Sequence, residues 1–318
     1  MYRPGPTRAF RSNGSWNSRC ACGRVERSPD GVPCRLHTAN FFDGVQPDGR
    51  TLIPVPLAIG IDAQLTETAD ATISRDRITA DEIVFRYGIP CATRLRGLFD
   101  AARDEPTVRE AVVAIDMMAA ARLVSISQLS GFVSLRPGWR GVEQVRDAMA
   151  LADEDSRSPN ETRMRLIWQL DARLPRPLVN RPVFDLNGRL LGVADLLDPV
   201  AGVVVEFDGA DHRRARRHSK DVAREEGFRN VDLEVCRVTG PDMAFPPRIV
   251  ARFESARGRA KWLPEGQRRW TIQPPPGWPP KLSLDEHFAF EAQMRDLHEQ
   301  MAREIAEATL AGERTLGL

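Results

Sequence analysis

The 318-residue sequence predicts an α/β protein: a mixed β-sheet core flanked by helices, preceded by an α+β region and followed by a C-terminal helix. Two observations predict the sheet. Residues 178–184 and 189–196 are strand-like and flank Asn187-Gly188, a turn pair typical of a β-hairpin. Val203, Val204 and Val205 are β-branched, which suits a buried strand. The length allows two domains and a sizeable core.

Composition restricts the location and the partners. The net charge is only +1, so any nucleic-acid surface must be local. No apolar run is long enough to cross a membrane, and Arg3, Arg8 and Arg11 are not followed by the apolar core of a secretory signal. Five cysteines are an odd number, which favours a reducing compartment and a metal or free thiols over disulfides. We therefore expect a cytoplasmic protein.

Residues 1–50 are predicted to be a leader with little capacity for a core. It contains Cys20, Cys22, Cys34 and His37, a set that suits tetrahedral zinc. A zinc ion with four protein ligands has no open position, so its role would be structural. The segment resembles the short zinc knuckles of some phage and bacterial nucleases. The alternative is a leader with incidental thiols.

Residues 51–152 are predicted to form an α+β domain. Residues 57–62 and 83–87 are the expected strands, and residues 92–103, 108–123 and 142–152 the expected helices. The middle helix has an apolar face formed by Ala111, Val112, Ile115, Met118 and Ala119.

Four stretches of this domain carry a family resemblance: residues 73–77, 89–94, 112–117 and 136–141. They resemble the middle region of AbiEi-type antitoxin proteins, which often precedes a nuclease-like domain. Such proteins usually begin with a winged helix-turn-helix, whose place is taken here by the cysteine-containing leader. The resemblance concerns packing and turn residues, and so it implies fold and not chemistry.

Residues 153–257 are predicted to form the sheet domain. Ser158, Pro159 and Glu161 form a capping box that begins a helix, whose buried side is expected to comprise Met164, Leu166, Ile167 and Leu170. A turn at Asp198-Pro199, completed by Ala201 and Gly202, joins the hairpin to the Val run. A further strand is expected at residues 233–238 and a closing helix at residues 241–257.

Two carboxylates interrupt these apolar strands. If the strands pair, Asp195 and Glu206 lie side by side near one edge of the sheet. Carboxylates that close repel each other unless a cation lies between them. Oxygen ligands suit Mg²⁺ or Mn²⁺ better than zinc, so the sequence predicts a magnesium or manganese site.

Residues 158–243 resemble the PD-(D/E)XK nuclease superfamily, which has a restriction-endonuclease-like fold, and within it the domains similar to the very-short-patch-repair (Vsr-like) endonuclease. The motifs are residues 158–163, 193–196, 205–209 with His212, and 234–239. The resemblance implies a catalytic set of Asp195, Glu206, Asp208, His212 and Glu161. Asp208 stands where the superfamily motif carries Lys. His212 can replace that Lys in moving a proton; otherwise Asp208 is a further metal ligand, or the site is inactive.

A basic run follows the acidic residues. It comprises Arg213, Arg214, Arg216, Arg217 and Lys220, with Arg224 further along the same predicted helix. A solvated helix face is one interpretation. The position beside the carboxylates favours contact with DNA phosphates.

Residues 258–318 are predicted to be a Pro-rich linker followed by an amphipathic helix. The linker includes residues 268–270 and 274–280. The helix has apolar residues at steps of three and four: Leu284, Phe288, Met294, Leu297, Met301 and Ile305. This helix either packs on the body or pairs with a protein partner or a second copy.

Three functions are compatible with these features. The first is a Mg²⁺-dependent DNA endonuclease acting in defence, repair or phage biology. The second is a non-catalytic DNA-binding or antitoxin-like regulator that retains a nuclease fold. The third is an interaction module acting through the C-terminal helix.

Overall fold

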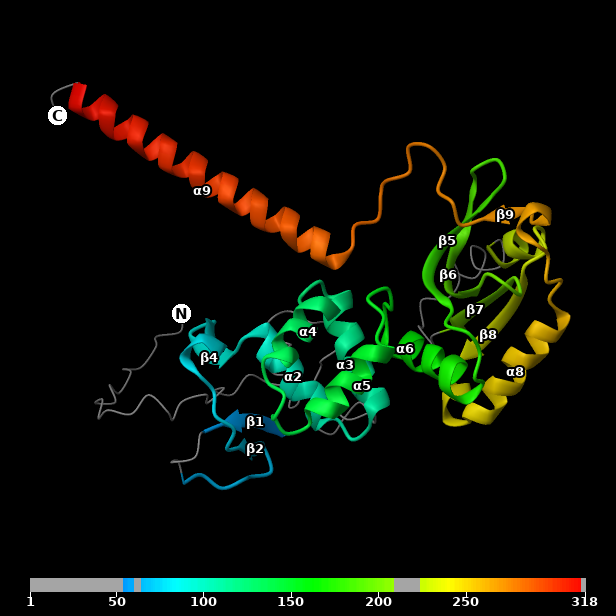
Figure 1. Cartoon of the computed structure of the whole chain (residues 1–318), viewed down its shortest axis with the longest axis horizontal. Coiled ribbons are helices and arrows are strands. Elements are labelled where there is room, and N and C mark those ends of the chain that lie inside the picture. The colour runs from blue at the N-terminus through cyan, green and yellow to red at the C-terminus, as the bar shows by residue number, and fades with distance from the viewer. Residues whose placement is uncertain (1–53, 60–63, 209–223, 316–318) are drawn as a thin grey trace, which may run out of the picture. The chain divides into compact units, whose positions relative to one another are not determined.

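The computed structural model describes residues 54–59, 64–208 and 224–315. It divides the chain into two compact units, one ending at Gly97 and the other beginning at Leu98. The fold is a mixture of helices and strands around a mixed sheet, as the sequence predicts (Figure 1). The domain boundaries expected from the sequence remain a prediction.

The unit that ends at Gly97 contains two pairs of short strands. β1 (Val55–Ala58) pairs in parallel with β2 (Ala71–Ser74), and β3 (Ile83–Arg86) pairs antiparallel with β4 (Ile89–Ala92). The strand predicted at 57–62 therefore begins earlier. β2 and β4 were not predicted from the sequence.

Helices dominate residues 98–151. α2 (Arg94–Asp104) begins in the first unit, and α3 (Val108–Ala120), α4 (Ile126–Ser134) and α5 (Val142–Leu151) follow. The five apolar positions predicted on α3 are all buried, but so are Val113 and Met117, since other helices cover α3 on several sides. α4 was not predicted, although Ser125 and Gln128 form a capping box at its start.

The second part of this unit is a five-stranded sheet in the order β8-β7-β6-β5-β9. β5 (Leu178–Asp185), β6 (Leu190–Asp198) and β7 (Val203–Asp208) are antiparallel neighbours, whereas β7 and β8 (Glu234–Thr239) run parallel. A parallel neighbour needs a crossover, and residues 224–229 in that connection are helical. The sheet is therefore mixed because β8 follows a crossover instead of a tight turn.

Both faces of the sheet are covered. On one face, α6 (Pro159–Leu166) and α8 (Pro246–Arg259) pack Met164 and Phe253 against Leu196 and Val205. On the other face, Phe228 packs against the strands with residues that include Val204 and Trp270. Val203, Val204 and Val205 are fully buried, which confirms the prediction of a buried strand.

The turns of the hairpin and of the Val strand lie where the sequence predicts them. At the first turn, the Asp185 N–H donates to the Arg189 carbonyl, so the loop has three residues instead of the expected two. Gly188 closes it with a φ of 82°, which glycine adopts without strain. At the second turn, Gly202 has a φ of 76° and donates its N–H to the Asp198 carbonyl.

The helix at Pro159 departs from its expected apolar period. α6 passes into the π-helical turn η2 (Ile167–Asp171), which widens the helix by one residue. Met164, Leu166 and Ile167 are buried as predicted, but Leu170 is exposed. The prediction for Leu170 is wrong because the π turn rotates it out of the α-helical register.

Part of the predicted linker belongs to the sheet. β9 (Trp270–Thr271) pairs antiparallel with β5, and Trp270 is buried in the core. Trp278 packs edge-on against Phe184, with ring centroids 4.8 Å apart. The expectation that Trp270 belongs to a linker is therefore wrong, because it pairs with β5, and Trp278 also contacts this strand through Phe184.

The predicted C-terminal helix is present as α9 (Leu284–Thr315). Its first turn is tied to α4, since the Ser125 and Ser127 hydroxyls each donate to Asp285 at 2.6 Å. Further along, Phe290, Leu297 and Met301 are exposed.

Candidate functional site

The candidate site lies where strands β6 and β7 separate. Their antiparallel pairing ends at the pair Leu196–Val205. Asp195 and Glu206 are the first residues beyond that pair on the two strands. β7 continues beside β8, with Glu206 opposite Arg237. The two carboxylates predicted from the sequence therefore come from neighbouring strands at the point where their mutual ladder stops.

Where the backbone ladder between β6 and β7 ends, the side chain of Asp195 makes the next hydrogen bond between the two strands. Oδ2 of Asp195 accepts a hydrogen bond of 2.8 Å from the backbone N–H of Phe207. The bond joins β6 to β7 across the place where they diverge. It also fixes the carboxylate of Asp195 against the backbone, so that its position is set by two strands.

Asn180 interrupts the ladder on the other side of β6. β5 and β6 pair at Val179–Leu196 and again at Arg181–Ala194, and the pairing omits Asn180 and Asp195. Asn180 has a φ of 45°, a left-handed conformation that Asn tolerates better than most residues. Residues two apart in a regular strand point to the same face of the sheet. At this break they do not: Leu196 packs in the core under α6 and α8, whereas Ala194 packs on the opposite face.

The buried side chain of Asn180 connects β5 to the start of α6. Its amide donates to Oε2 of Glu161 at 2.7 Å and to the Asp155 carbonyl at 2.8 Å. Glu161 also accepts from the Arg157 N–H at 2.9 Å and from the Ser158 hydroxyl at 3.0 Å. Ser158 therefore caps the helix as expected. The carboxylate of Glu161, however, accepts from the backbone N–H of Arg157 instead of that of Ser158.

Glu161 and Asp195 interact electrostatically. Burial raises the pKa of Asp195 to about 6, from 3.8. The hydrogen bond from Phe207 lowers this pKa, the negative charge of Glu161 raises it, and Arg224 and Arg157 lower it. A carboxyl group with this pKa is poorly stabilised as an anion by the protein alone, and a nearby cation would favour its ionised form.

Glu206 is held by an arginine on the crossover helix. It is buried, and its Oε2 lies 2.6 Å from Nη2 of Arg224. Arg224 reaches Glu206 across Gly192 of β6, where a Cβ atom would lie 2.8 Å from Cγ of Arg224 and 2.8 Å from Cζ of Phe228. Gly192 thus allows the arginine and the aromatic ring to pack directly on the strand backbone.

Of the remaining predicted site residues, the structure describes Asp208 and not the others. Asp208 is exposed at the end of β7. His212, Arg213, Arg214, Arg216, Arg217 and Lys220 lie outside the described residues, as do the proposed zinc ligands Cys20, Cys22, Cys34 and His37. The two cysteines within the described ranges, Cys91 and Cys236, are both buried.

The carboxylates of Asp195 and Glu206 are ligands of the kind that a hard divalent cation such as Mg²⁺ prefers. In residues 54–59, 64–208 and 224–315, no group of three or more His, Cys, Asp or Glu side chains has the arrangement of a metal site. Mg²⁺, however, is usually held by one or two carboxylates together with water and substrate phosphate. Asp195, which is partly buried and has a raised pKa, is a carboxylate that would be stabilised as an anion by such an ion. Glu206, on the adjoining strand, is the second.

Sequence analysis missed Asn180 and Gly192. Asn180 stands within a predicted strand, where Asn is uncommon, and that is the signal that could have marked it. Gly192 follows Leu190 and Leu191 in β6, and glycine inside a strand often marks close approach of another group. Neither signal says which residue is the partner.

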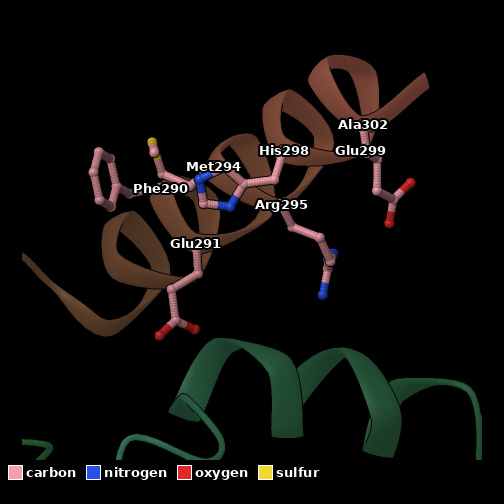
Figure 2. A pocket seen from close by; sticks show the side chains of 7 residues that line it. All are labelled: Phe290, Glu291, Met294, Arg295, His298, Glu299 and Ala302. Carbon is pink, nitrogen blue, oxygen red and sulfur yellow. The ribbon is translucent and has the colours of Figure 1, made fainter. Parts of the chain in front are cut away.

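A hollow on α9 does not form a second site of this kind. It has a volume of about 450 Å³ and is lined by seven side chains that all belong to α9 (Figure 2). Figure 2 shows Phe290, Met294 and His298 following one another along the helix. Because one helix supplies the whole lining, the hollow is an open surface depression and not an enclosing pocket.

Comparisons with protein-family models, with curated proteins and with solved structures give no match to this chain. In the part of the chain that the structure describes, no helix is both long and apolar enough to span a membrane.

Proposed function

We propose that this protein is a Mg²⁺- or Mn²⁺-dependent DNA endonuclease of the Vsr-like type, which hydrolyses phosphodiester bonds. The observation that carries the proposal is Asp195: a partly buried carboxylate with a pKa of about 6, at the point where its strand parts from the strand of Glu206, and within the electrostatic reach of Glu161. A carboxylate that only stabilised the fold would be expected to have its charge neutralised by the protein. The order of a capped helix, a hairpin and a buried strand around these residues is also that expected from the resemblance.

The residues would divide the work as follows. Asp195 and Glu206 would hold the cation, and Glu161, fixed by Asn180, would add negative charge beside it. The chemistry that the cation supplies when bound is neutralisation of charge on the phosphoryl oxygen and activation of water. The role of His212 in moving a proton rests on the sequence alone.

Arg224 would have two roles. In the structure it neutralises Glu206 through the 2.6 Å ion pair. Its side chain remains about one third exposed, so the guanidinium can also reach a DNA phosphate. Arginine can bind two oxygens of one anion, which makes an exchange from carboxylate to phosphate chemically reasonable.

The test is cleavage of supercoiled plasmid with Mg²⁺ or Mn²⁺. Wild type is expected to nick the plasmid, and Asp195→Asn and Glu206→Gln are expected to lose about 100-fold or more, because each removes a charged ligand without changing its shape. Since a cation competes with the proton on Asp195, the rate is expected to rise as the pH passes about 6.

A matched control is Asp185→Asn, which changes a partly exposed carboxylate at the hairpin end of β5 and should leave nicking unchanged. Failure of wild type to cut duplex, single-stranded or mismatched DNA with either metal would refute the enzyme. DNA binding without cleavage would then favour the regulator.

A further inference from the structure

α8 carries a polar stripe beside its buried face. Ile249, Phe253 and Ala256 pack into the core. Arg248, Arg252, Ser255 and Arg259 follow at steps of four, three and four residues, so they lie along one side of the helix. At 1.5 Å per residue the stripe is about 16 Å long.

This stripe forms one wall of a groove at the edge of the sheet. The other wall is β8, the last strand in the sheet order, with Val235, Cys236 and Arg237. The groove has a volume of about 480 Å³. Its lining contains four arginines and no acidic residue: Arg237, Arg248, Arg252 and Arg259. We call it the arginine groove.

Three of the four arginines are held in place by acids outside the lining. Arg237 pairs with Glu225 at 2.7 Å, Arg252 with Asp242 at 2.7 Å, and Arg259 with Glu234 at 2.6 Å. These bonds position the guanidinium groups along the groove.

Donor capacity remains in the groove. Within the described ranges, Arg248 makes no ion pair; its guanidinium stands 5.5 Å from the centroid of the Phe245 ring. Nε of Arg237 is buried and has no hydrogen-bond acceptor among the residues that the structure describes. A buried donor without an acceptor costs free energy unless a ligand or water satisfies it.

The groove adjoins the candidate site. Arg237 of β8 lies opposite Glu206 of β7 in the strand register. Their backbones are therefore separated by one strand spacing, about 4.8 Å. An extended polyanion whose scissile phosphate lay at Asp195 and Glu206 could continue into the groove over its length of about 16 Å.

We propose that the arginine groove binds the phosphodiester backbone of DNA beside the bond that is cut. The choice of DNA as the anion rests on the proposed function. Guanidinium groups bind phosphate through paired N–H donors, and contacts of this kind position DNA without selecting its sequence. Arg248 is the residue to test, because it has no acidic partner to leave behind.

The experiment is fluorescence anisotropy with a short labelled duplex, in EDTA so that nothing is cut, over a series of KCl concentrations. Arg248→Glu is expected to weaken binding about tenfold and to reduce the slope of log K against log[KCl] by about 1, as loss of a phosphate contact does. Arg248→Lys should keep most of the affinity.

The matched control is Arg146→Glu, which makes the same charge change on α5, where Arg146 pairs with Glu143. It should alter the dissociation constant less than about twofold. Equal binding by wild type and Arg248→Glu, or no binding by wild type at low salt, would overturn the groove; its arginines would then only protect the sheet edge. The binding assay needs no cleavage. A plasmid assay that refuted the nuclease would therefore leave the result of the binding assay unaffected.

Discussion

At the scale of single residues, ionised Asp195 lowers the free energy of unfolding. Burial is the largest cause of its raised pKa, and the neighbouring charge of Glu161 adds to it. The shift from 3.8 to about 6 corresponds to roughly 3 kcal/mol that ionisation of this one group subtracts from the free energy of unfolding. Groups with such shifts cluster at functional sites, where a bound ligand can offset the cost of their ionisation.

The sign of the pH dependence follows from the direction of the shift. The folded state binds this proton more tightly than the unfolded chain, so the contribution of Asp195 to stability is greatest below pH 4. It is lost as the pH rises to about 6. Asp195→Asn removes the titration and keeps an oxygen that can accept from the Phe207 N–H. We therefore expect the variant to exceed wild type in free energy of unfolding by up to about 3 kcal/mol above pH 6.

Urea unfolding at several pH values, without metal, measures this difference. Near pH 4 the two proteins should be close in stability. Added Mg²⁺ or Mn²⁺ should stabilise wild type and not the variant, since a bound cation acts only on the folded state. A variant that is less stable than wild type at every pH would show that the carboxylate contributes to the fold more than its burial costs.

At the scale of elements, the crossover helix is fitted to β6 through one glycine. Arg224 and Phe228 pack on Gly192, and a Cβ atom there would come within 3 Å of both side chains. Phe228 is fully buried, so its ring has little room to move. The position of Arg224 over Glu206 therefore depends on the absence of a side chain at residue 192.

Gly192→Ala is expected to reduce the free energy of unfolding by about 1–3 kcal/mol, the usual cost of overpacking, and to displace Arg224 from Glu206. Chemical denaturation measures the stability. Gly258→Ala is the control, because it lies in α8 with no atom within 4 Å of its Cβ position. That substitution should stabilise by about 0.5–1 kcal/mol through helix propensity. Equal effects of the two substitutions would mean that the contact at Gly192 is not tight.

At the scale of the whole unit from Leu98 onward, a buried ion pair joins the helical part to the sheet part. Asp116 of α3 and Arg165 of α6 are both fully buried, 2.7 Å apart. Asp116 also accepts from the Thr162 hydroxyl and from the Asp153 N–H, each at 2.8 Å. Burial raises the pKa of Asp116, and Arg165 opposes that shift. Because α6 also carries Glu161, the pair fixes the helix that supplies one side of the candidate site.

Asp116→Ala is expected to cost about 3–5 kcal/mol, since it leaves Arg165 charged, buried and unpaired. The double replacement Asp116→Leu with Arg165→Met should recover much of that loss, because it removes both charges. Thermal or urea unfolding of the full chain measures both. A single and a double variant of equal stability would show that the pair does not act as a unit.

Short-range chemistry predicted much of the architecture. The cap at Ser158, the Asn187-Gly188 turn and the β-branched run at 203–205 each depend on neighbouring residues. The cap by the Ser158 side chain and the buried strand are confirmed, and the turn is in its predicted place but with a loop of three residues instead of two. Elements of two to four residues, such as β4 and β9, lack a period of their own and depend on a partner strand. Leu170 was misplaced for a related reason, because a π turn cannot be inferred from an α-helical period.

The sequence by itself determined that Asp195 and Glu206 interrupt apolar strands, because an acidic residue among valines and leucines is conspicuous in one dimension. Only the tertiary structure decided what surrounds them. It brought Asn180 from β5 to Glu161 on α6, and Arg224 across Gly192 to Glu206, through contacts between residues more than ten positions apart. Such contacts arise from the ends of the strand ladders and from the packing of helices on both faces of the sheet, and no local pattern encodes either.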